Sequence, residues 1–212
     1  MAVQLDETEV RVLGALMEKE IATPEYYPLS LNALVSACNQ KSNREPVVSY
    51  DEATVDAALA GLRAKGLAVR ISGPDMRVPK HQHRLAECFN LGRREAAVLC
   101  VLLLRGPQTA GELRSRTERL YQFDDLEAVD ACLNRMLEGP PDPLVARLPR
   151  QPGYKETRYV HLLSGEPPVL PAVQARAEPG DALARLQATV DRVEKEIADL
   201  QRQFAEFRKQ FE

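Results

Sequence analysis

The feature that most constrains this chain is a repeat of its own sequence. Residues 51–71 combine a helix with one apolar face and a short strand of alternating polarity, and Gly66 separates the two. A similar segment begins 74 positions later, at Asp125, and the N-terminal helix returns 86 positions later, at Leu91. Because two sets of matches occur in the same order, we infer a duplicated domain of roughly 80 residues per copy.

Each copy is predicted to run helix, extended segment, helix, helix, strand, turn and strand, which is the order of a winged helix. The expected fold is therefore α+β and mainly helical. We place winged-helix domain 1 at residues 1–84, winged-helix domain 2 at 85–164, a proline-rich linker at 165–181 and a coiled-coil helix at 182–212. Residues 81–90 should form a short connection that keeps the two domains in contact.

Local signals set the expected boundaries in the first copy. Asp6 and Glu9 form a capping-box pattern for a helix that ends near Glu20, and Ser30 is the expected cap of the second helix. The first hairpin should end near residue 80. In the second copy we expect helices over 93–105, 110–118 and 124–138, then strands over 144–148 and 155–163.

Composition excludes several classes of protein. The net charge of −3 gives no general attraction to nucleic acid or to anionic membranes, and neither domain is net basic. The N-terminus lacks the basic start and apolar run of a signal peptide, and no apolar run is long enough to span a membrane. The four cysteines are too few for a disulfide scaffold. We expect a cytoplasmic protein without membrane contact.

The C-terminal segment carries an unbroken heptad pattern that predicts a dimer seam. A strict spacing of 3.5 residues favours self-pairing into a homodimer, and the alternative is a helix that folds back on its own domains. The flanking positions do not determine whether the helices run parallel or antiparallel. The apolar positions of the seam are Leu183, Leu186, Val190, Val193, Ile197, Leu200, Phe204 and Phe207, with Phe211 continuing the spacing.

Three long segments of the chain are similar to the YceH-like family of bacterial proteins. They read LNALVSACNQKSNREPV, LLLRGPQTAGELRSRTERLYQF and PGYKETRYVHLLSGE. The resemblance covers residues 5–165 and both predicted domains. It implies tandem winged helices in a bacterial cytoplasm, and it implies no reaction, ligand or DNA site.

The third helix of each domain is a poor candidate for reading DNA bases. In the first copy the face opposite the apolar one carries Ala53, Ala57, Ala60 and Ala64. Base readout needs side chains such as arginine or asparagine, which can reach base edges, and alanine has no such donor. We expect this small-residue face to pack against a partner or the other domain, or else to be an ordinary solvated face.

Basic residues elsewhere could hold phosphates without reading sequence. The strongest candidate is the loop over residues 39–46, which has more polar donors than a connector needs; its alternative role is a capping network that shapes the turn. The candidate nucleic-acid contacts are Lys41, Ser42, Asn43, Arg44, Arg70, Arg77, Lys80, Arg114, Arg116, Arg147, Arg150 and Lys155, with Arg119 and Arg158 close to them in sequence.

Catalytic and metal signals are weak. His81, His83 and Cys88 form one small cluster without a second ligand pair, and the chain has no phosphate-binding glycine loop or hydrolase motif. We therefore expect no enzyme activity, no metal and no cofactor. The leading hypothesis is a DNA-binding or transcription-regulatory protein that contacts double-stranded DNA, and the alternative is a winged-helix adaptor that binds another protein.

Overall fold

The computed structural model describes residues 3–74, 76–139, 142–149 and 156–165. All of them belong to one compact unit, which spans residues 1–150 and 154–169. The proline-rich linker and the predicted dimer seam from Leu183 to Phe207 lie outside the described residues. Among the helices that are described, none is long and apolar enough to cross a membrane.

The N-terminal half forms a three-helix layer with a small sheet, and the local signals position its helices. Asp6 caps α1 with the predicted capping box to Glu9, and Ser30 caps α2 through the backbone N–H of Ala33. The elements are α1 (Glu7–Ala22), the 3₁₀ turn η1 (Pro24–Tyr26), β1 (Leu29–Ser30), α2 (Leu31–Cys38), α3 (Glu52–Ala64), β2 (Ala68–Ile71) and β3 (Lys80–His83).

The first sheet has the antiparallel order β1-β3-β2, with His81 opposite Leu29 on one side and opposite Arg70 on the other. The expectation that residues 81–90 form only a connection is wrong. His81 and His83 point inward and are buried in β3, and a short helix, α4 (Leu85–Phe89), follows. The inward face of a strand is usually recognised from apolar residues at alternate positions. Here those positions hold histidine, so the sequence pattern did not indicate a strand.

The C-terminal half repeats the same element order. It contains α5 (Arg93–Arg105), α6 (Ala110–Thr117), α7 (Leu126–Glu138), β4 (Val145–Arg147) and β5 (Tyr159–His161). Where the first half has β1, the second has a single antiparallel bridge between Gln108 and Tyr159. The protein is thus α+β, with seven α-helices and two small antiparallel sheets in its described part.

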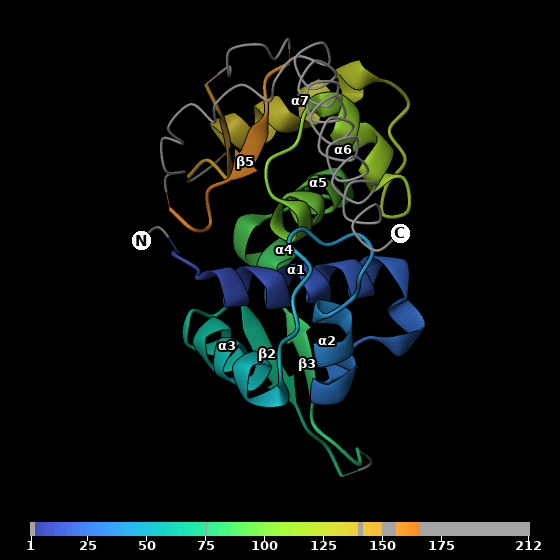
Figure 1. The fold of residues 1–212 in the computed structure, drawn as a ribbon, viewed down its shortest axis with the longest axis vertical. Coiled ribbons are helices and arrows are strands. Elements are labelled where there is room, and N and C mark those ends of the chain that lie inside the picture. Colours follow the sequence, from blue (N-terminus) through green and yellow to red (C-terminus); the bar gives the residue numbers. More distant parts are fainter. Residues whose placement is uncertain (1–2, 75, 140–141, 150–155, 166–212) are drawn as a thin grey trace, which may run out of the picture. The chain divides into compact units, whose positions relative to one another are not determined.

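The two halves share one apolar core because their first helices pack directly together (Figure 1). Gly14 of α1 and Cys100 of α5 occupy equivalent positions of the repeat, and they touch: the Cys100 thiol donates to the Gly14 carbonyl at 3.6 Å. A Cβ atom at Gly14 would lie 2.9 Å from Leu104 Cδ2. The absence of a side chain at Gly14 therefore sets how closely α1 and α5 approach.

Candidate functional site

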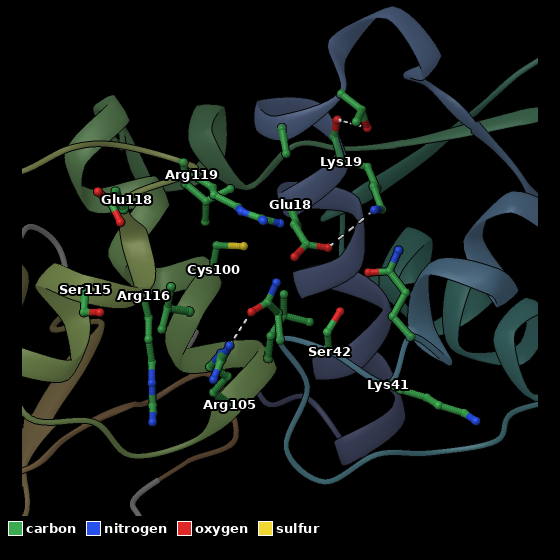
Figure 2. Close-up of a pocket in the computed structure, with 17 residues that line it drawn as sticks. Glu18, Lys19, Lys41, Ser42, Cys100, Arg105, Ser115, Arg116, Glu118 and Arg119 are labelled. Atoms are coloured by element: carbon green, nitrogen blue, oxygen red, sulfur yellow. Dashed lines mark hydrogen bonds and ion pairs between the residues drawn. The ribbon is translucent and has the colours of Figure 1, made fainter.

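A cleft of about 1030 Å³ opens between the two halves, and both contribute equivalent parts to its walls (Figure 2). The last turns of α1 and α5 form two of the walls. The third wall is the segment that follows α2, and the fourth is the C-terminal end of α6 with the residues after it. The lining residues are Glu18, Lys19, Ala22 and Thr23; Gln40, Lys41, Ser42 and Asn43; Cys100, Val101, Leu104 and Arg105; and Ser115, Arg116, Glu118, Arg119 and Leu120. We call this site the basic cleft.

The basic cleft carries an excess of positive charge. Five of its lining residues are lysine or arginine and two are glutamate. One of the glutamates, Glu18, is neutralised by Arg44 at 2.6 Å and has Lys19 at 3.8 Å. Within the described ranges, no carboxylate oxygen lies within 4.0 Å of a side-chain nitrogen of Lys41, Arg105 or Arg119. These three cations are therefore not paired with a carboxylate of the described residues.

Arg44 does not fit the expectation that it contacts phosphates. Its side chain is completely buried, and its guanidinium donates to both carboxylate oxygens of Glu18, at 2.6 and 3.1 Å. It also donates to the carbonyl oxygens of Ala37 and Asn43 and to the amide oxygen of Gln40. A guanidinium with this many internal acceptors is a structural group, and it holds the turn from α2 into the loop.

Other contacts fix the remainder of the loop over residues 39–46. The Asn39 side chain bonds both backbone groups of Tyr50 at 2.8 Å, which closes the base of the loop. The Glu45 backbone N–H donates to the Leu104 carbonyl at 2.9 Å and so ties the loop to the end of α5. The capping role predicted as the alternative therefore holds for Asn39 and Arg44, while Lys41, Ser42 and Asn43 remain exposed at the cleft.

Arg105 and Arg116 lie on the side of the cleft formed by the second half. Arg105 donates to the side-chain oxygen of Asn43, across the two halves. Arg116 donates to Gln108 and has Glu112 at 3.5 Å. Burial, followed by the nearby positive charge of Arg116, lowers the pKa of Arg105 from its usual value. The positive charge of Arg105, in a partly buried site, favours the binding of an anion.

The cleft floor is apolar. Val101 and Leu104 are buried beneath it, and Cys100 points into it opposite Glu18 (Figure 2). Burial raises the pKa of the Cys100 thiol far above its usual range, so the thiol stays protonated and weakly nucleophilic. Cys100, which is fully buried and donates to the Gly14 carbonyl, therefore belongs to the contact between α1 and α5.

The other predicted contacts do not line the cleft. Arg70 and Arg77 are exposed, and Lys80 is half-buried, on a hairpin that extends away from α5 and α6 (Figure 1). Arg114 is exposed and bonds to the Asp124 carbonyl at 2.7 Å. Arg147 bonds to Asn134 at 2.7 Å and lies over the Tyr159 ring. Arg150 and Lys155 lie outside the described residues.

The alanine face of α3 does not pack against the second half. Ala53, Ala57, Ala60 and Ala64 are all exposed in the described unit. The prediction that this alanine face packs against the other domain is therefore wrong. Contact between the alanine face and a separate partner remains a prediction.

The histidine and cysteine cluster has separate partners. His83 lies 2.9 Å from Glu20, and Cys88 donates to the Gly66 carbonyl at 3.7 Å. In the part of the chain that the structure describes, no three histidine, cysteine or acidic side chains gather as metal ligands.

The comparison with known proteins gives a clear family assignment. The profile of a family described as "protein of unknown function, DUF480" matches residues 5–154. A UPF0502 protein of Solibacter usitatus is 59% identical over 99% of this chain and 98% of its own length. This chain belongs to the UPF0502 family. A UPF0502 protein of Geobacter sulfurreducens is 49% identical over the full length of both chains. The resemblance to uncharacterised YceH-like proteins is thereby confirmed, and these names carry no activity.

Two cleft residues of this UPF0502 protein, Lys19 and Arg105, were not among those predicted from the sequence. Arg105 follows a buried run at the end of a helix, where a cation ordinarily complements the helix dipole. The signal that could have found it is the repeat: Lys19 and Arg105 are 86 positions apart, which is the offset of α1 and α5. Equivalent cations in both copies meet at the cleft.

Proposed function

We propose that this UPF0502 protein is a non-enzymatic DNA-binding regulatory protein, built from two winged-helix domains, that contacts phosphates at the rim of the basic cleft. The observation that carries the proposal is that Lys41 and Arg119, both exposed and with no carboxylate of the described residues within 4.0 Å, line one cleft, although neither half is net basic. Lysine and arginine that face solvent without a carboxylate partner are the groups that grip a phosphate backbone.

The third helix of the first half, α3, supports backbone contact in preference to base readout. The exposed side of α3 offers alanines and, near its start, Glu52 and Asp56. Carboxylates there repel phosphates, and alanine cannot donate to a base edge. DNA affinity should accordingly depend strongly on salt and weakly on sequence.

Replacing Lys41 and Arg119 together by alanine is expected to weaken binding to sheared genomic DNA and to lower its salt dependence. Non-specific binders have Kd values of ~10⁻⁴–10⁻⁶ M, and log Kd changes with log salt by about 0.9 for each phosphate contact. Loss of two contacts should therefore reduce that slope by about 1.8. Fluorescence anisotropy at several salt concentrations measures both quantities.

The matched control is Arg84→Ala with Arg93→Ala, which removes two exposed cations away from the cleft. This variant has the same net charge as the test variant, and it should retain the wild-type slope. If wild-type protein at tens of micromolar does not bind DNA at low salt, or if both double variants lose affinity equally, DNA contact at the cleft is wrong.

A protein-binding adaptor is the second candidate function. The exposed alanine face of α3 supports it, because small side chains let another backbone approach closely. An adaptor would need an apolar groove along α3. Neither the basic cleft nor a smaller cavity of about 440 Å³ beside Arg94 and Tyr121 is such a groove, because no residue of α3 lines either of them. The cations that line the basic cleft are the observation that favours DNA contact over this alternative.

Truncation after Gly165 is expected to convert a homodimer into a monomer, because the heptad stripe from Leu183 to Phe207 would be removed. Light scattering coupled to size exclusion measures the subunit number of the full and truncated chains at equal concentration. Glu194→Gln in the full chain, which leaves the apolar stripe intact, is the control and should remain dimeric. An unchanged subunit number after truncation would contradict self-pairing.

A further inference from the structure

We propose that the interior of the basic cleft binds a small phosphorylated ligand of the nucleoside polyphosphate class. The polyphosphate would contact Arg105 and Arg119, and a face of the base would lie on the floor formed around Val101, Leu104 and Leu120. This inference does not require DNA binding, although Arg119, which is exposed and extends into the cleft, belongs to both proposed contact surfaces.

The size and lining of the cleft fit such a ligand. Small-molecule sites occupy roughly 300–1000 Å³ and combine an apolar wall with a few polar groups that converge on the ligand. The basic cleft has about this volume, 1030 Å³, but its lining is mainly polar and charged, with Val101, Leu104 and Leu120 as a small apolar floor, a balance that suits a highly charged ligand. Val101 and Leu104 are only 4% and 3% exposed, so the apolar surface that they provide lies at depth rather than at the rim.

The cations of the cleft are placed for an anion smaller than a nucleic acid. Arg105 projects from the last turn of α5 and is partly buried. Its guanidinium donates a hydrogen bond to the side chain of Asn43, which is uncharged and so leaves the positive charge of Arg105 unneutralised. Arg119 extends into the cleft toward Glu18, whereas Lys41 extends outward at its edge (Figure 2). Planar guanidinium groups bind phosphate oxygens in pairs, and more strongly when water is partly excluded.

Hydroxyl donors and the two carboxylates complete the surface. Ser42 and Ser115 line opposite sides of the cleft, and both are exposed. Glu18 is already held by Arg44, which leaves Glu118 as the negative lining group whose charge opposes an anionic ligand. The remaining charge still favours a polyanion, since Lys19, Lys41 and the three arginines surround the cavity.

The experiment is calorimetric titration of the full-length protein with ATP, pyrophosphate and adenosine as separate probes. ATP should bind most tightly, pyrophosphate more weakly and adenosine weakest, because ATP alone uses both the cations and the apolar floor. Arg105→Gln should weaken ATP binding about 10- to 100-fold, the loss that accompanies removal of one charge-assisted hydrogen bond. Arg77→Gln, an exposed arginine of the first hairpin, is the matched control and should bind ATP as the wild type does.

A second variant tests the same site without removing the hydrogen bond that Arg105 donates to Asn43. Ser42→Glu adds a carboxylate at the exposed rim, so it should keep the fold and also weaken ATP binding. The inference is overturned if the wild type binds neither ATP nor pyrophosphate at millimolar concentration, or if Arg105→Gln and Ser42→Glu both bind ATP normally. Wild-type binding to DNA is measured without ATP, so a failure of one proposal is distinguishable from a failure of the other.

Discussion

Replacing Arg44 by alanine is expected to lower the free energy of unfolding by about 3–5 kcal/mol, the range measured when one member of a buried ion pair is removed. Arg44 is the fully buried centre of a network that joins α1, α2 and the loop over residues 39–46. Its loss leaves the Glu18 carboxylate with only Lys19, and it leaves the Ala37 carbonyl without two of its donors. Chemical denaturation followed by circular dichroism measures the change.

Lys41→Ala provides the matched control, because Lys41 lies three positions earlier in the same loop and is exposed. Surface substitutions of this kind change stability by no more than about 0.5 kcal/mol. The comparison also separates the two roles in the loop, since Arg44→Ala should destabilise the fold while Lys41→Ala with Arg119→Ala should weaken DNA binding without destabilising the fold. A loss below about 1 kcal/mol for Arg44→Ala would show that the network is not a stabilising centre.

The sequence predicted the elements that depend on local signals. The cap at Asp6, the cap at Ser30 and the strand that starts after Gly66 all follow from side chains that act within a few residues, and the structure has each of them. The backbone at Gly66 has φ +74°, a conformation that glycine adopts readily, which is why the helix ends there. Errors arose where polar residues are buried, as at His81 in β3.

The candidate site was only partly predictable because it lies between segments that are distant in sequence. Lys41 and Arg116 were identified separately, but nothing in a local pattern indicates that they line one cleft. Arg44 and Lys41 look equivalent in sequence, and only the position of Glu18 distinguishes the buried arginine from the exposed lysine. The repeat offset relating Lys19 to Arg105 was the one sequence signal that could have linked the two halves.

Replacing Gly14 by valine is expected to destabilise the protein by about 3 kcal/mol, because the added side chain would overpack the contact between α1 and α5. A Cβ atom at Gly14 would meet Leu104 Cγ at 3.0 Å and Leu103 Cβ at 3.1 Å. The Leu103 Cβ atom is fixed by its backbone, so relief requires the two helices to separate. Since this contact joins the two halves, the separation of α1 and α5 should also widen the basic cleft and lower its affinity for any ligand that contacts both halves.

Gly111→Ala is the matched control for this prediction. Gly111 is also a helical glycine, but it is exposed, and a Cβ atom there would meet only Thr109 Oγ1, at 3.9 Å. Alanine is favoured over glycine by about 1 kcal/mol within a helix, so Gly111→Ala should stabilise the protein. The unfolding temperature should therefore fall below that of the wild type for Gly14→Val and rise above it for Gly111→Ala. If Gly14→Val unfolds at or above the wild-type temperature, close approach of α1 and α5 does not depend on the glycine.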